Sequence, residues 1–102
     1  KMRGQLRSAN GSDFVAREHY ERVTSMRLTR EVIRLLPYIQ YVLMNNQVFD
    51  ISKITLEENA IIQELKTKGC LFDHNGHIHC TLEFWTVINE VLYLAYVDYE
   101  EE

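Results

Sequence analysis

Residues 55–69, TLEENAIIQELKTKG, carry the strongest signals for the fold. Thr55 and Glu58 form a capping box, in which the Thr55 hydroxyl accepts from the Glu58 amide and the Glu58 carboxylate accepts from the Thr55 amide. Two lysines fall in the last turn, and Gly69 follows at the C-terminal cap. The stretch predicts a helix over residues 56–68. Its apolar residues are expected along one side: Leu56, Ala60, Ile61 and Leu65.

The residues after this helix predict a β-hairpin. Asn75-Gly76 is the preferred pair for a two-residue type I′ turn, because both positions need a positive φ. Beyond the turn, Ile78, Cys80, Leu82 and Phe84 alternate with polar residues, as in a half-buried strand. Closing this turn opposes His74 to His77, Asp73 to Ile78, Phe72 to His79 and Leu71 to Cys80. In that register the core face holds Leu71, Ile78 and Cys80, and the outer face holds Cys70, Phe72, His74, His77 and His79.

Two helices are predicted before residue 47. The first runs from Ser12 to about Arg22, with Ser12 or Asp13 as its cap and an apolar stripe of Phe14, Val15, His19 and Tyr20. The second follows Thr29, a typical N-cap, with Glu31 placed favourably in its first turn. Pro37 lies inside its apolar pattern, which predicts a kink there or a junction of two short helices. Asn45-Asn46 is expected to end it.

Two segments are ambiguous. Residues 47–54, QVFDISKI, fit either a short strand or a one-turn helix. Residues 87–102, VINEVLYLAYVDYEEE, fit a helix from about Trp85 or a strand from Val91 to Tyr99 that would extend the hairpin into a meander. We favour the helix. In either form this segment presents more apolar surface than a small monomer covers easily, which predicts self-association.

The stretch IIQELKTKGCLFDHNGHIHCTLEF, within residues 56–84, resembles the recognition helix and wing of the winged-helix superfamily. A helix ending in LKTKG is followed by an apolar residue that starts the first wing strand, and the second strand runs on to a threonine. The resemblance implies a small winged-helix-like domain, and such proteins commonly insert the recognition helix into the major groove of DNA. Here that helix carries Glu57, Glu58 and Glu64 and no arginine, and Asn59 and Gln63 are its only base-reading side chains. We therefore expect this helix not to enter a DNA groove.

The 102 residues suit one domain, because 46% hydrophobic and 25% charged residues is an ordinary globular composition. The net charge of −4 excludes a uniformly basic nucleic-acid or membrane binder. No apolar run is long enough to span a membrane, and the basic start is not followed by an apolar signal core. Two cysteines are too few for a disulfide scaffold, so we expect an intracellular setting, cytoplasmic or nuclear.

The charge is unevenly distributed along the chain. The first 34 residues hold eight basic and four acidic side chains, including all seven arginines, whereas the rest hold three basic and eleven acidic ones. Arg27, Arg30 and Arg34 are spaced by three and four, which predicts one basic helical face. This face is expected to meet an anionic partner, nucleic acid included, or the acidic half of the protein itself, within the chain or across a dimer.

The sequence predicts no catalytic site. It lacks a phosphate-binding glycine loop, a nucleophile elbow and a paired His-Glu helix motif. His74, His77 and His79 share the predicted outer face of the hairpin, so a three-histidine metal site is geometrically possible. The expected register separates Cys70 from Cys80, and the spacing matches no known zinc pattern. We therefore predict no enzyme activity, no metal, no cofactor and no small-molecule substrate.

The domain predicted from these patterns is a helix-rich α+β domain over residues 13–99, winged-helix-like, with a C-terminal β-hairpin. Residues 1–12 are read as a flexible tail and residues 100–102 as an acidic tail. The favoured function is a regulatory or scaffolding module that binds a protein partner and itself, without membrane contact. Its predicted partner-binding residues are Trp85, Leu92, Tyr96 and Tyr99. The alternative is a transcriptional regulator that binds DNA or RNA through Arg27, Arg30 and Arg34.

Overall fold

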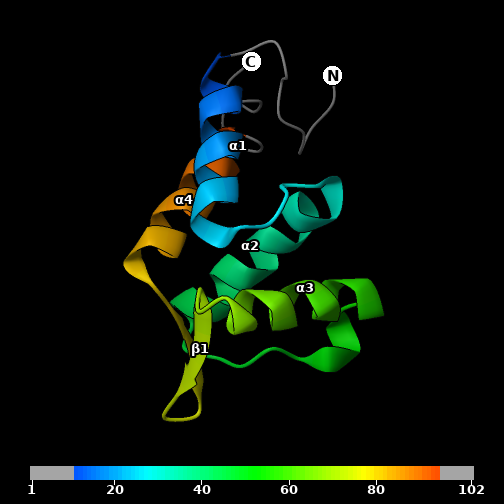
Figure 1. Ribbon diagram of the computed structural model, residues 1–102. Coiled ribbons are helices and arrows are strands. Elements are labelled where there is room, and N and C mark those ends of the chain that lie inside the picture. Colours follow the sequence, from blue (N-terminus) through cyan, green and yellow to red (C-terminus); the bar gives the residue numbers. More distant parts are fainter. Residues whose placement is uncertain (1–10, 95–102) are drawn as a thin grey trace.

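The computed structural model describes residues 11–94, and the side chains of residues 15–94. In this part of the chain, helices α1 (Gly11–Thr24) and α2 (Arg30–Met44) are followed by a single 3-10 turn, η1 (Ile51–Lys53), and helix α3 (Leu56–Thr67). A two-stranded antiparallel hairpin, β1 (Leu71–His74) and β2 (His77–Cys80), leads into helix α4 (Leu82–Leu92). The protein is therefore a small, helix-rich α+β domain with its hairpin in the C-terminal half (Figure 1).

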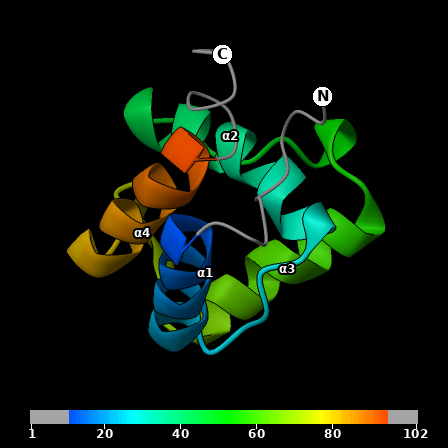
Figure 2. The same cartoon turned by 90° about the horizontal axis from the view of Figure 1, so that it is seen from above.

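Helices α1 and α4 lie side by side and run in opposite directions (Figures 1 and 2). Tyr20 of α1 and Phe84 of α4 are both fully buried, with their ring centroids 6.5 Å apart. One residue before Tyr20 on α1, His19 Nδ1 lies 3.0 Å from a carboxylate oxygen of Glu90. Across the same core, the side-chain Nε2 of Gln40 in α2 donates to the side-chain Oδ1 of Asn89 in α4 (2.7 Å). These contacts place α4 between α1 and α2.

The predicted first helix is confirmed, but its buried stripe differs. The helix starts at Gly11, inside the predicted tail, and buries Ala16, Tyr20 and Thr24 at a spacing of four. Val15 is exposed instead, and the side chain of Phe14 lies outside the described residues. The Thr24 hydroxyl donates to the Tyr20 carbonyl, so this polar residue is accommodated in the core (2.8 Å).

Helix α2 begins as predicted, with the Thr29 hydroxyl accepting from the Val32 amide. It ends at Met44, and Asn46 in the following turn has a positive φ. It is one helix: Pro37 lies inside it, so the alternative of two short helices is wrong. The ring points to an exposed position, and the apolar side chains on the other face fill the core: Val32, Ile33, Leu35, Leu36, Ile39 and Val42.

The ambiguous segment after α2 contains the one-turn helix rather than a strand. Asp50 caps η1 by accepting from the Ser52 amide. Upstream of this turn the backbone is extended, and the Gln47 carbonyl accepts from the Ile78 amide of β2 (3.2 Å). The chain after α2 is thereby held against the hairpin.

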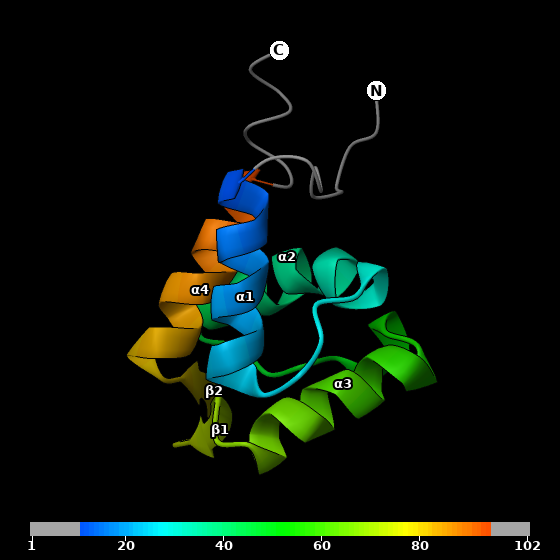
Figure 3. The same cartoon turned by 45° about the horizontal axis from the view of Figure 1, so that its top comes forward.

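Helix α3 and its capping box are confirmed, and Gly69 has a positive φ (82°) at the end of the helix. Its buried face was predicted in part: Leu65 is buried as expected, but Ile62 is buried in place of Ile61. Ile62 and Leu65 are the buried residues, whereas Leu56 is 85% exposed and Ala60 is exposed too. Figure 3 shows the C-terminal end of α3 beside the hairpin, which it supports.

The hairpin has the predicted register, from Leu71 opposite Cys80 to His74 opposite His77, with Asn75 and Gly76 both at positive φ. The second strand ends at Cys80, so the strand expected to continue to Phe84 is wrong. The Thr81 hydroxyl accepts from the Phe84 amide and caps α4, which starts three residues before Trp85. Cys70 is 4% exposed and lies in the core, not on the outer face where it was placed.

Candidate interaction surfaces

A groove lies between the end of α2, the segment around η1 and the hairpin tip. Its volume is about 860 Å³. Tyr38 and Phe49 contribute packed rings, with centroids 5.8 Å apart. The other lining residues come from three segments: Tyr41 of α2, residues 46–53, and Gly76 and His77 of the hairpin.

Local hydrogen bonds hold the shape of this groove. The Asp50 amide donates to the Tyr38 hydroxyl (2.8 Å), which ties the start of η1 to α2. The Asp50 carboxylate accepts from both the amide and the hydroxyl of Ser52, and these bonds lower the pKa of Asp50. This carboxylate is therefore ionised at neutral pH and already occupied as a helix cap.

Four large apolar side chains are exposed around the groove. We call them the groove surface, and each is between 53% and 70% exposed: Tyr41, Met44, Val48 and Ile51. A smaller hollow of about 240 Å³ lies beside Met44 and is closed by Leu43, Ile78 and Trp85, among others. The sequence did not reveal the groove surface, because periodicity within one segment does not show which of its apolar side chains a distant element covers.

Of the predicted partner-binding residues, only Trp85 reaches one of these hollows. Leu92 is 8% exposed and packs in the core, so it is not available to a partner in this structure. Tyr96 and Tyr99 lie outside the described residues. In the described part of this segment most apolar side chains are buried, whereas Tyr93 is 51% exposed. The self-association expected from this segment stays a prediction.

The predicted arginine face is only partly helical. Arg30 and Arg34 lie one turn apart on α2, but Arg27 lies in the loop before it, because the Thr29 cap starts the helix at Arg30. All three side chains are exposed, and none makes a hydrogen bond or ion pair with another described residue. Arg17 differs, since its Nη1 donates to the Leu28 carbonyl (2.6 Å) and braces the loop between α1 and α2.

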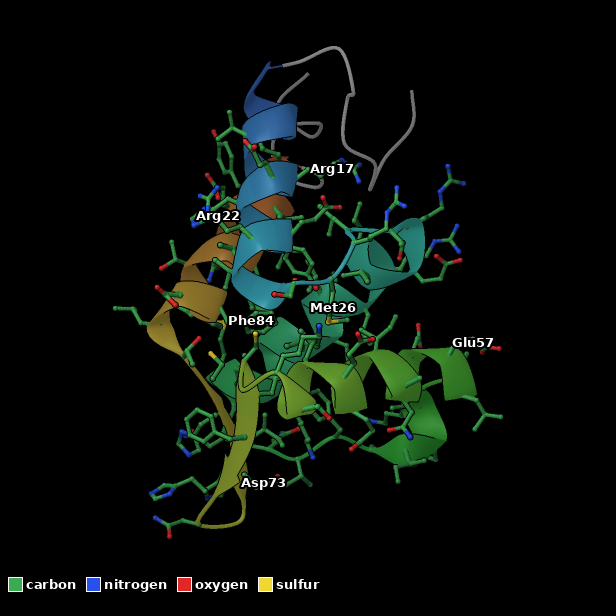
Figure 4. The ribbon with its side chains drawn as sticks, viewed as in Figure 1. Arg17, Arg22, Met26, Glu57, Asp73 and Phe84 are labelled. Carbon is green, nitrogen blue, oxygen red and sulfur yellow. The ribbon has the colours of Figure 1, made fainter. Side chains whose placement is uncertain are left out.

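The lysines at the end of α3 already have partners. Lys66 Nζ lies 3.3 Å from the Asp73 carboxylate on β1. Lys68 Nζ lies 3.9 Å from Glu64 and donates to the Ser25 carbonyl (3.2 Å). In Figure 4, Glu57 projects from the opposite end of the helix. The exposed side of α3 is therefore not a basic surface. This agrees with the prediction from the sequence of the helix.

The outer face of the hairpin brings together Phe72, His74 and His79. The His79 ring stacks on Phe72 (centroids 6.0 Å apart) and meets His74 edge-on (5.4 Å). Among the described residues no group of three or more histidine, cysteine or acidic side chains is arranged to hold a metal ion.

Both cysteines are free thiols, Cys70 in the core and Cys80 partly buried. Burial is the main cause that raises the pKa of each thiol, with the negative charge of Glu83 adding to the effect at Cys70. Neither thiol is therefore activated as a nucleophile at neutral pH.

Comparison of the sequence with protein-family models, with curated proteins and with solved structures found no match in any of the three. Within residues 11–94 no helix is long and apolar enough to cross a membrane.

Proposed function

We propose that the protein is a non-enzymatic regulatory or scaffolding module that binds another protein through the groove surface and also associates with itself. The observation that carries this proposal is the concentration of exposed apolar side chains in and beside a groove of about 860 Å³. Exposed apolar patches with a concave centre and a polar rim are typical of sites that bind proteins or peptides.

The chemistry of the groove supports binding over catalysis. Among the described residues that line the groove, Asp50 is the only carboxylate and is occupied by the cap of η1. Lys53 is the only other charged side chain in that described lining. The two free cysteines support an intracellular setting as part of the same proposal.

The groove is tested with a phage-displayed library of random peptides panned on the wild-type protein. Enriched peptides are labelled with a fluorophore and titrated by fluorescence anisotropy against the wild type and the Tyr41→Ser and Ile51→Ser variants. We expect apolar peptides to be enriched, and each substitution to weaken their binding by about tenfold, since burying one large apolar side chain contributes roughly 1.5–3 kcal/mol.

The matched control is Leu82→Ser, because Leu82 is 78% exposed but lines none of the described hollows. It is expected to bind the enriched peptides as the wild type does. Peptides that bind the Tyr41→Ser and Ile51→Ser variants with unchanged affinity would exclude the groove surface as the docking site.

A second candidate function is binding of DNA or RNA through Arg27, Arg30 and Arg34. The observation that favours it is that these three guanidinium groups are exposed and without partners among the described residues. Guanidinium groups suit bidentate recognition of phosphate. Labelled duplex DNA and single-stranded RNA are titrated at about 50 and 200 mM salt, and affinity that falls steeply between the two would support this function.

The winged-helix resemblance remains part of the proposal. It is supported by the order of α2, η1, α3 and the β1–β2 hairpin. If it holds, α3 corresponds to the recognition helix and the hairpin to the wing. The glutamates of α3 would repel DNA phosphates, so this helix is not expected to enter a DNA groove.

A further inference from the structure

The arginines at the start of α2 are not neutralised by the acidic half of the chain. The described residues form three ion pairs, namely His19 with Glu90, Lys66 with Asp73 and Lys68 with Glu64, and none includes an arginine. Within the described part of one molecule, the arginines of the basic half therefore do not pair with carboxylates of the acidic half. These exposed arginines are therefore accessible to an anionic surface of another molecule.

A complementary acidic surface lies on the same side of the molecule. Helices α2 and α3 both begin on that side, as Figures 1 and 3 show from two directions. Arg30 is the first residue of α2, and Glu57 is in the first turn of α3, where it projects outward in Figure 4. The neighbouring Leu56 is 85% exposed and adds apolar area.

We propose that this side of the protein is the contact between two copies of the chain, with Arg30 and Arg34 of each copy against Glu57 of the other. A two-fold interface uses the same surface on both copies, so a surface that carries both signs of charge complements itself. Rotation by 180° brings the basic part of one copy over the acidic part of its partner, and each arginine–carboxylate contact then occurs twice. Arginine favours such pairs because its planar guanidinium binds a carboxylate in a bidentate way.

Nucleic acid fits the same side less well. A phosphate backbone would meet the exposed carboxylates of Glu31 and Glu57 along with the arginines, and like charges weaken such binding. With a second copy of the chain, both the arginines and the carboxylates face side chains of opposite charge. This inference rests on the self-association in the proposed function and names the surface responsible for it.

The test is a charge-swap experiment followed by sedimentation equilibrium. The wild type is expected to dimerise at about 50 mM salt and to dissociate as salt approaches about 500 mM, because screening weakens exposed ion pairs. The Arg30→Glu/Arg34→Glu variant and the Glu57→Arg variant are each expected to dimerise about tenfold more weakly or worse, since attraction becomes repulsion at both symmetric contacts. An equimolar mixture of the two variants should recover the wild-type dimer as a heterodimer.

The control variant is Arg22→Glu, because Arg22 is exposed near the end of α1 and away from the start of α2 (Figure 4). It should dimerise like the wild type. The proposal is overturned by a wild type that stays monomeric at low salt, by a mixture that recovers no dimer, or by dimers insensitive to both reversals. It is also overturned if labelled duplex DNA binds the wild type and not the Arg30→Glu/Arg34→Glu variant. The peptide assay of the groove is independent of these results. A wild type that stays monomeric also removes self-association from the proposed function, whereas dimers insensitive to both reversals remove only the surface proposed here.

Discussion

At the scale of single residues, Tyr20 brings a polar hydroxyl into the core. Its side chain is fully buried, yet its hydroxyl has no hydrogen-bond partner. The nearby Thr24 hydroxyl donates to the Tyr20 carbonyl and not to the phenol oxygen. Burial raises the pKa of Tyr20, so the phenol stays neutral. The ring therefore stabilises the core while its hydroxyl loses hydrogen bonds with water.

We predict that Tyr20→Phe leaves the free energy of unfolding unchanged or raises it by about 1 kcal/mol, because an unsatisfied buried polar group is removed without creating a cavity. Tyr20→Ala should lower it by about 3–5 kcal/mol through loss of the ring. Urea unfolding followed by circular dichroism measures both. A loss of more than about 1 kcal/mol in Tyr20→Phe would show that the hydroxyl has a partner, such as an ordered water.

Cys70 and Arg27 were both placed wrongly by a local sequence pattern. Cys70 precedes β1 and is held by the hydrogen bond from its amide to the Leu65 carbonyl, so strand alternation does not apply to it. Arg27 has helical spacing to Arg30, but the Thr29 cap excludes it from the helix. In both cases the start of an element decides where the side chain points.

At the scale of elements, Thr81 separates the hairpin from α4. Its amide donates to the Cys70 carbonyl, as a strand residue would, while its hydroxyl caps the helix that follows. The alternation of Ile78, Cys80, Leu82 and Phe84 continues past this point in the sequence, although the strand does not. Strand alternation and the helix cap at Thr81 overlap in this stretch, and the backbone forms the helix after Thr81.

Thr81→Ala is predicted to lower the free energy of unfolding by about 1 kcal/mol, with a range of about 0.5–2 kcal/mol, because the Phe84 amide loses its acceptor. The control is Thr86→Ala, an exposed position inside α4 where alanine has the higher helix propensity and no loss is expected. Chemical denaturation of the two variants gives the comparison. Equal stabilities would mean that the cap contributes nothing.

In helix α3, the apolar pattern of the sequence does not specify which residues are buried. Leu56, Ile61, Ile62 and Leu65 are all apolar, so more than one stripe is compatible with the sequence. The structure buries Ile62 and Leu65 against α2 and the hairpin and leaves Leu56 exposed at the first position. The residues of the capping box were predictable because they act within one turn.

At the scale of the whole molecule, α1 is held mainly by α4. The two helices are distant in sequence, and their contact is centred on Tyr20 and Phe84 with the His19–Glu90 pair beside it. The stability of the N-terminal half therefore depends on a segment near the other end of the described chain.

Phe84→Ala is predicted to lower the free energy of unfolding by about 3–5 kcal/mol, because it leaves a cavity between α1 and α4. Since a small domain has only about 5–15 kcal/mol in total, amide hydrogen exchange in α1 should accelerate strongly. Leu82→Ala is the control, since Leu82 is exposed on the same helix and little change is expected. Slow exchange in α1 of the Phe84→Ala variant would show that α1 is held by other contacts.

The sequence by itself determined the features that act over a few residues. These are the caps at Thr29 and Thr55, the Asn75-Gly76 turn with its strand register, and the α+β class that they imply. Each depends on hydrogen bonds or backbone angles within one turn, which residue type and spacing specify directly.

Only the tertiary structure decided which apolar residues are buried. Tyr41, Met44, Val48 and Ile51 are as apolar as their buried neighbours, and no described element covers them, whereas Leu92 is packed into the core. Burial depends on which distant elements pack together, and local periodicity does not contain that information. The groove surface forms only because the fold brings separate segments together, and the starts of α2 and α3 lie on one side of the molecule for the same reason.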